Sequence, residues 1–181
     1  MANTTSTYTN GYSGEYDITI PNYLASGTGI SITAYISSNE KSIFTIMWGD
    51  PKSEEVPSLV INSAYGNVLA IGNAGYTQYS SSAGWKTIFL KSAINFNSWN
   101  TFNIFYNGTN VILTINGKSG TVGILPLFNN LFRLFFNNNV ILGGIAYTNS
   151  STVSYPFSDN ANVTSYIDFA DPNNPVVYGD T

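Results

Sequence analysis

Two pairs of carboxylate residues are, by their spacing, the best candidates for catalytic groups. Glu15 and Asp17 alternate, so in a β-strand both side chains would face the same side. Two carboxyl groups about 5–5.5 Å apart can cleave a glycosidic bond with retention of configuration. Glu54 and Glu55 lie between two prolines in a charged segment, which is typical of an exposed loop without the apolar pocket that an acid–base pair needs. We expect both pairs to be solvated surface groups.

The sequence contains no histidine and no cysteine. Histidine is the usual general base, and cysteine supplies thiolate nucleophiles, thiolate metal ligands and disulfides. Serine–histidine and cysteine–histidine mechanisms are therefore excluded. With no further nucleophile or phosphate-binding motif, we expect a protein that is not an enzyme.

Few residues of the chain are charged. Only 9% of the residues are charged, six of them Lys or Arg against ten Asp or Glu. So few cations exclude a surface that tracks nucleic-acid phosphates. No stretch reaches the roughly 20 apolar residues of a membrane helix, and residues 1–20 lack the apolar segment of a cleavable signal peptide. A surface of neutral hydroxyls and amides suits exposure to variable conditions, although an AT-rich genome would produce the same composition.

Short runs rich in β-branched and aromatic residues recur along the chain at the spacing of a β-sandwich. Residues 30–36 alternate, which places Ile30, Ile32, Ala34 and Ile36 on one face. No helical period persists for more than two turns. We predict an all-β protein with strands near 16–20, 29–37, 42–48, 57–63, 66–71, 85–91, 99–106, 111–116, 131–136, 140–147 and 163–169.

The clearest element is a hairpin between residues 99 and 120. Two apolar-rich runs flank a polar loop at 107–110, and the second run ends in Asn116-Gly117. Asn-Gly favours a type I′ turn, in which both central residues have positive φ. The alternation predicts four side chains that face the core: Phe102, Ile104, Leu113 and Ile115.

This hairpin resembles the central hairpin of laminin-G-like, concanavalin A-like β-sandwiches, in which a Trp opens a strand and the return strand ends in a hydrophobic-Asn-Gly step. The resemblance implies a two-sheet antiparallel jelly-roll sandwich with Trp99 at the edge of the core. Jelly-roll glycosidases of this kind carry a third acid two or three residues after the pair. Thr19 and Ile20 stand at those positions here, so the resemblance does not support hydrolysis.

The resemblance also suggests two kinds of binding site. Domains of this family often hold one Ca²⁺ at the sandwich rim, for which Asp50, Asp159 and Asp168 are the available acids. None lies in a dense Asp-x-Asp-x-Asn motif, so we expect no cofactor, with Ca²⁺ as the alternative. Lectin-type sugar binding uses an aromatic platform, and the loop with Tyr76, Tyr79 and Trp85 is the candidate, unless these rings merely coat the surface.

The two ends of the chain are expected to be extended arms around a sandwich domain at 15–170. Residues 1–14 contain little apolar surface beyond Tyr8 and Tyr12, too little to offset the entropy of ordering. Such an arm could add a strand to the sheet edge of a neighbouring subunit. Residues 171–181 carry two prolines and are expected to be an extended tail.

These features favour, first, a non-enzymatic virion surface or capsid-decorating subunit, located on a virion or an extracellular surface. The alternative is a carbohydrate-binding adhesin or lectin module of a cell surface or phage tail. A glycoside hydrolase of the same fold ranks third. The expected partners are further copies of the chain or other virion subunits, with glycans as a further partner in the lectin alternative.

Overall fold

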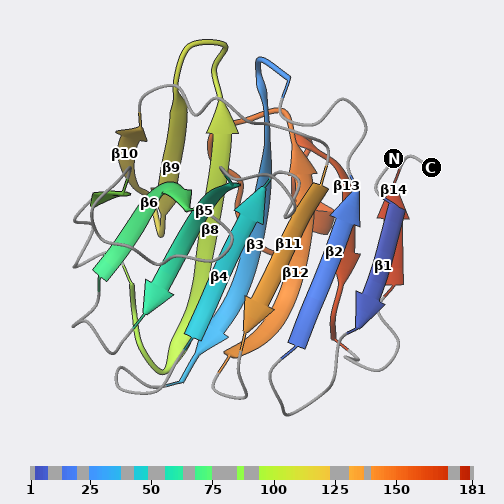
Figure 1. Ribbon diagram of the computed structural model, residues 1–181. Coiled ribbons are helices and arrows are strands. Elements are labelled where there is room, and N and C mark those ends of the chain that lie inside the picture. Colours follow the sequence, from blue (N-terminus) through green and yellow to red (C-terminus); the bar gives the residue numbers. More distant parts are fainter. Residues whose placement is uncertain are drawn as a thin grey trace.

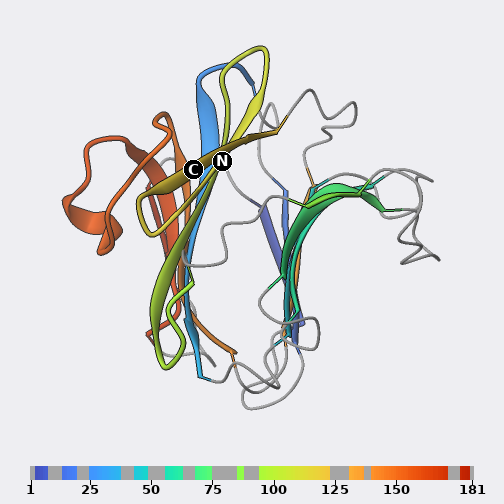
Figure 2. The same ribbon diagram turned by 90° about the vertical axis from the view of Figure 1, so that its left-hand side faces the viewer.

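The computed structural model describes residues 3–7, 14–19, 25–37, 43–48, 56–62, 68–74, 85–87, 94–122, 131–136, 140–170 and 176–179. These residues form two seven-stranded antiparallel sheets that pack face to face (Figures 1 and 2). The predicted all-β, two-sheet antiparallel sandwich is confirmed. Within the described residues, the one helical element is a 3-10 turn, η2 (Phe157–Asp159).

The strand order follows a jelly roll. The first sheet contains, in spatial order, β1 (Asn3–Thr7), β2 (Gly14–Thr19), β11 (Leu131–Phe136), β4 (Ile43–Trp48), β5 (Val56–Asn62), β6 (Val68–Ala74) and β7 (Trp85–Thr87). The second contains β10 (Lys118–Val122), β9 (Val111–Ile115), β8 (Ser98–Tyr106), β3 (Thr28–Ile36), β12 (Val140–Thr148), β13 (Val163–Asp168) and β14 (Val176–Gly179).

The core lies between the sheets and is built by alternation. The four predicted residues of β3 and the four of the β8–β9 hairpin are all buried, as expected. Phe44 of β4 and Leu134 of β11 face them from the first sheet. The ring of Phe44 lies 5.4 Å from that of Phe102, centroid to centroid. Removal of this apolar surface from water is the main stabilising term of the sandwich.

Turn chemistry fixes the hairpin register. Asn116 and Gly117 have φ values of 49° and 83°, which are the positive angles of the predicted type I′ turn. In the other loop, Asn107 Oδ1 accepts hydrogen bonds from the backbone N–H groups of Thr109 and Asn110, at 2.9 and 2.7 Å. This side chain therefore satisfies two backbone donors that the strand ladder does not reach.

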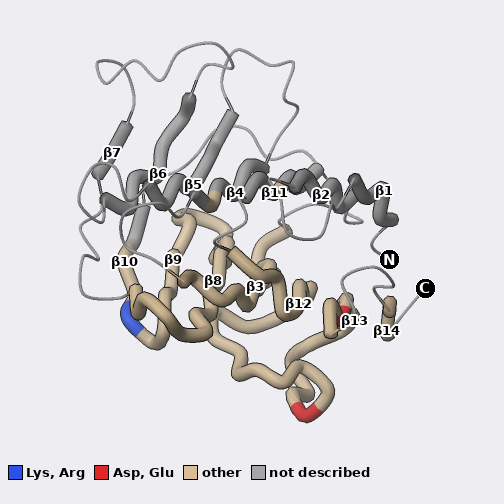
Figure 3. The backbone as a smooth tube through the Cα atoms, turned by 90° about the horizontal axis from the view of Figure 1, so that it is seen from below, with Lys and Arg blue, Asp and Glu red and all other residues tan. Residues whose placement is uncertain are grey.

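Short segments near both ends of the chain belong to the two sheets. Residues 3–7 form β1, which pairs with β2 of the same chain, and β14 pairs with β13. Docking of residues 1–14 on a neighbouring subunit stays a prediction. Within its own chain, β1 covers an edge of the first sheet, and β14 covers an edge of the second. The reason is that an edge offers unpaired backbone groups to any β-compatible segment, whichever chain supplies it. β1 and β14 lie at the same end of the sandwich (Figure 1), and β14 lies next to β13 at the edge of the second sheet (Figure 3). Tyr8 and Tyr12 lie outside the described residues.

The carboxylate pairs can be placed only in part. Glu15 and Asp17 occupy alternate positions of β2, opposite Thr7 and Thr5 of β1. Glu54 and Glu55 lie outside the described residues. The described helical segment is far too short to cross a membrane.

Candidate functional site

The outer face of the second sheet carries a row of polar side chains. Ser119 of β10, Thr114 of β9, Asn103 of β8 and Ser31 of β3 stand opposite one another in the strand register. They point away from the core because they alternate with its apolar residues. Thr114, Asn103 and Ser31 are nevertheless buried, so another segment must cover this face.

The cover is the segment 149–162 between β12 and β13, which folds back along the outer face of the second sheet (Figure 2). Val153 and Phe157 of this segment are buried against Ala146 of β12. They form a small apolar cluster separate from the main core. This cluster anchors the segment and makes it the wall of a groove.

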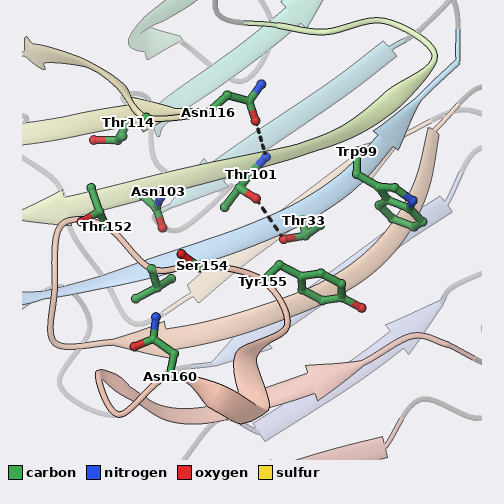
Figure 4. Close-up of a pocket in the computed structure, with 12 residues that line it drawn as sticks. Thr33, Trp99, Thr101, Asn103, Thr114, Asn116, Thr152, Ser154, Tyr155 and Asn160 are labelled. Atoms are coloured by element: carbon green, nitrogen blue, oxygen red, sulfur yellow. Dashed lines mark hydrogen bonds between the residues drawn. The ribbon is translucent and has the colours of Figure 1, made fainter.

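The groove lies between this wall and strands β3, β8 and β9, with a volume of about 470 Å³ (Figure 4). That volume is within the range of small-molecule sites, roughly 300–1,000 Å³. Its floor consists of short polar side chains from the strands, and its wall carries Thr152, Ser154 and Asn160. Among the twelve described residues that line it, none carries a formal charge at neutral pH.

An aromatic pair closes one end of the groove. The rings of Trp99 and Tyr155 are stacked, with centroids 6.5 Å apart and planes 15° from parallel. They remain 50% and 44% exposed. Trp99 is therefore not at the core edge, and that expectation was wrong. The reason is the parity of β8: Phe102 and Ile104 face inward, so residue 99 faces outward.

A glycine provides the space that Trp99 occupies. β12 contains an irregularity in its pairing with β3 between Leu142 and Gly144. A Cβ atom on the intervening Gly143 would lie 2.7 Å from Cζ3 of Trp99. The indole ring thus packs on bare backbone, and its position depends on the absence of a side chain there.

Replacing Gly143 by alanine is expected to displace the indole ring, because only the half-exposed end of a side chain opposes the new methyl group. The near-UV circular dichroism of the stacked pair should weaken, while the melting temperature changes little. The matched control is Gly144→Ala, whose Cβ would lie 2.9 Å from the buried ring of Phe157, so this variant should lower the melting temperature. An unchanged near-UV spectrum in Gly143→Ala would contradict this account.

A network of amides holds the floor in place. Asn100 is fully buried, and its Oδ1 accepts hydrogen bonds from the Asn95 backbone N–H at 2.8 Å and from Asn116 Nδ2 at 2.7 Å. Its Nδ2 donates to the carbonyls of Asn95 and Ser98. Asn116 Oδ1 in turn accepts from the Thr101 N–H at 2.9 Å (Figure 4). The turn at Asn116 is thereby fixed to the strand that carries Trp99.

Two buried polar atoms in the described part of the chain have no hydrogen-bond partner: Ser31 Oγ and Asn103 Oδ1. These residues stand opposite each other on β3 and β8. Asn103 lines the groove and is only 5% exposed. Buried polar atoms without a partner are rare in native proteins, and each needs an explanation, such as a bound water, an ion or a functional role.

The electrostatic environment is mildly acidic at one end. Burial and then the charge of Asp168 raise the pKa of Tyr155 above 10.0. Asp159 lies in η2, and Asp168 ends β13, where its Oδ1 accepts a hydrogen bond from the Ala170 N–H at 2.8 Å. Asp50 lies outside the described residues. Over the described ranges, no three Asp or Glu residues gather as metal ligands.

The aromatic loop proposed from the sequence does not belong to the groove. Trp85 begins β7, at the edge of the first sheet, whereas the groove lies on the second. Tyr76 and Tyr79 lie outside the described residues. Sequence reasoning missed the groove, although the parity of the hairpin already placed Trp99 on the side of Thr101 and Asn103.

No protein-family model matches the sequence. Nor does its comparison with curated proteins give a match. The fold does match solved structures. The toad ovary galectin in complex with thio-digalactose aligns over 75% of this chain and 98% of its own, with a TM-score of 0.56 and 10% identity. Chicken galectin 2 aligns over 77% and 99%, with a TM-score of 0.55 and 11% identity. Xenopus laevis galectin-Ib aligns over 79% and 99%, with a TM-score of 0.52 and 13% identity.

These similar structures are galectins, and the likeness confirms the jelly-roll sandwich fold that the hairpin implied. Identities this low establish shared architecture and leave the ligand to be argued from the groove. The chain thus has the sandwich fold of the galectins.

Proposed function

We propose that this protein is a carbohydrate-binding module and that the groove of the second sheet holds a neutral saccharide. The observation that carries the proposal is the lining itself: hydroxyl and amide groups without charge, ended by a stacked and half-exposed aromatic pair. A sugar ring offers C–H faces to an aromatic ring and hydroxyls to amides. An apolar platform with a few placed polar groups is the usual make-up of a small-ligand site.

The structural relatives support the same class of function. Two of the similar structures are complexes of toad ovary galectin with thio-digalactose and with N-acetylgalactose, and a third is congerin II with lactose. Galectins are non-enzymatic lectins, which agrees with the expectation of no enzyme. The virion or capsid-decorating role ranked first from the sequence gains no support from these relatives, and the lectin alternative is the better one.

The test is isothermal titration of the full chain with lactose, cellobiose, maltose, N-acetylgalactosamine and sialyllactose. We expect at least one neutral saccharide to bind. Sialyllactose should bind more weakly than lactose, because Asp159 and Asp168 lie beside Asn160 and Tyr155 of the lining. If none of these saccharides binds, the proposal fails.

Affinity for the bound saccharide is expected to be the same at about pH 5 and about pH 8. Tyr155 is the one ionisable group among the described lining residues, and burial with the charge of Asp168 raises its pKa above 10.0. It therefore stays neutral across this range and would ionise only at higher pH. A change in Kd of more than about threefold between the two pH values, roughly 0.65 kcal/mol, would show that a titrating group contributes to the site.

A further inference from the structure

The groove contains three amide side chains, and their carbonyl oxygens are in different states. Asn116 Oδ1 accepts from the Thr101 N–H, and Asn160 Oδ1 accepts from the Asn162 N–H at 2.9 Å. Asn103 Oδ1 is buried and has no partner. Among the described residues that line the groove, Asn103 therefore offers the one amide carbonyl that the protein itself leaves unused.

The neighbouring hydroxyls are also engaged with one another. Thr33 Oγ1 and Thr101 Oγ1 lie 3.4 Å apart, and Thr114 Oγ1 lies 2.9 Å from Ser119 Oγ. A ligand that bonds to these groups competes with contacts that already exist, so the gain is small. A ligand that donates to Asn103 Oδ1 satisfies an atom that is otherwise desolvated and unpaired, so the gain is larger.

The aromatic pair does not discriminate between different sugars in this way. Trp99 and Tyr155 present ring faces, which accept the C–H surface of many sugars. Discrimination is strongest where a site is built to bond one polar group, because an analogue without that group leaves a buried partner unsatisfied. The groove thus separates a tolerant end at the aromatic pair from a selective position at Asn103.

We propose that Asn103 is the specificity-determining residue of the groove, and that its Oδ1 accepts a hydrogen bond from one hydroxyl or acetamido N–H of a bound neutral saccharide. This inference rests on the proposed carbohydrate-binding function. It assigns the selection among neutral sugars to a residue of β8, while affinity common to all of them comes from the aromatic pair.

The test compares the wild-type chain with Asn103→Leu, which is nearly isosteric and lacks the acceptor. Both are titrated with lactose, cellobiose, maltose and N-acetylgalactosamine. The wild type should prefer one sugar by about tenfold or more, and Asn103→Leu should lose that preference while keeping its affinity for the weakest binder. The melting temperature of the variant should be equal or higher, because an unpaired buried polar atom has been removed. Asn103→Ala serves as a second variant if the leucine side chain does not fit.

The matched control is Asn160→Leu, which removes a lining amide whose carbonyl already has a partner. This variant should change the affinity for every sugar by the same factor. Monodeoxy forms of the preferred sugar complete the test: one deoxygenation should cost the wild type about tenfold and cost Asn103→Leu nothing.

Three results would overturn the inference. Asn103→Leu could keep the sugar preference of the wild type, or it could lose affinity equally for every sugar. The third such result is a wild-type protein that binds the sugars without preference. A wild type that binds none of the sugars would overturn the proposed function itself, and the inference with it.

Discussion

Trp99→Ala is expected to weaken saccharide binding by at least about tenfold, which corresponds to roughly 1.4 kcal/mol. Trp99 is half exposed, and its indole ring forms one side of the stacked pair at the end of the groove. Truncation of an exposed Trp that packs against a ligand is among the costliest changes in binding sites. The fold should remain, because the ring lies on the outer face of β8 and is not part of the core.

The informative control is Trp85→Ala. Trp85 was the sequence-based platform, and it begins β7 at the edge of the other sheet. Titration of both variants with the same saccharide separates the two locations. Loss of binding in Trp85→Ala, with normal binding in Trp99→Ala, would place the site on the first sheet and refute the groove.

Asn100→Ala should produce the largest loss of stability of any change proposed here, about 2–4 kcal/mol. The side chain is fully buried and makes four hydrogen bonds, three with backbone groups and one with Asn116. Alanine would leave these partners desolvated and unpaired. Urea denaturation monitored by far-UV circular dichroism gives the difference in the free energy of unfolding.

Asn149→Ala provides the comparison, since Asn149 is exposed and follows β12 directly. Its effect on the free energy of unfolding should stay within about 0.5 kcal/mol. If Asn100→Ala also falls within that range, the amide network does not hold the floor of the groove. Reduced saccharide affinity in Asn100→Ala, at a temperature where it is folded, would further link the network to the site.

Periodicity made the centre of the fold predictable. Alternation in β3 and in the β8–β9 hairpin identified the inward-facing residues correctly, since burial of one face enforces the register of the whole strand. The Asn116-Gly117 turn was predictable because few residues tolerate its positive φ values.

The edge strands were not predictable in the same way. β10 is Lys-Ser-Gly-Thr-Val, and β1 is Asn-Thr-Thr-Ser-Thr, so neither shows an apolar face. These segments become strands because a neighbouring strand offers unpaired backbone groups, which is a property of the folded sheet. All four residues of β14 are exposed, and this strand lies at the other edge of the second sheet, where it pairs with β13.

The groove was hidden for a different reason. It joins β3, β8 and β9 to the segment 149–162, which is remote from them in sequence. Polar residues such as Asn103 and Thr114 resemble ordinary surface positions until Val153 and Phe157 anchor the covering segment. Trp99 was assigned to the core from a family position, although the parity of the strand indicated exposure.

β3 differs from most strands of a sandwich because it is covered on both faces. Its inner face lies in the core, and Ser31 and Thr33 are almost completely inaccessible on the outer face. Amide hydrogens in such a strand exchange with solvent only when the whole domain unfolds, whereas a surface segment anchored by two side chains can open locally at much lower free energy. The floor of the groove therefore belongs to the slowest-exchanging part of the molecule and its wall to a faster one. A ligand would therefore contact a rigid floor on one side and, on the other, a wall that opens more easily.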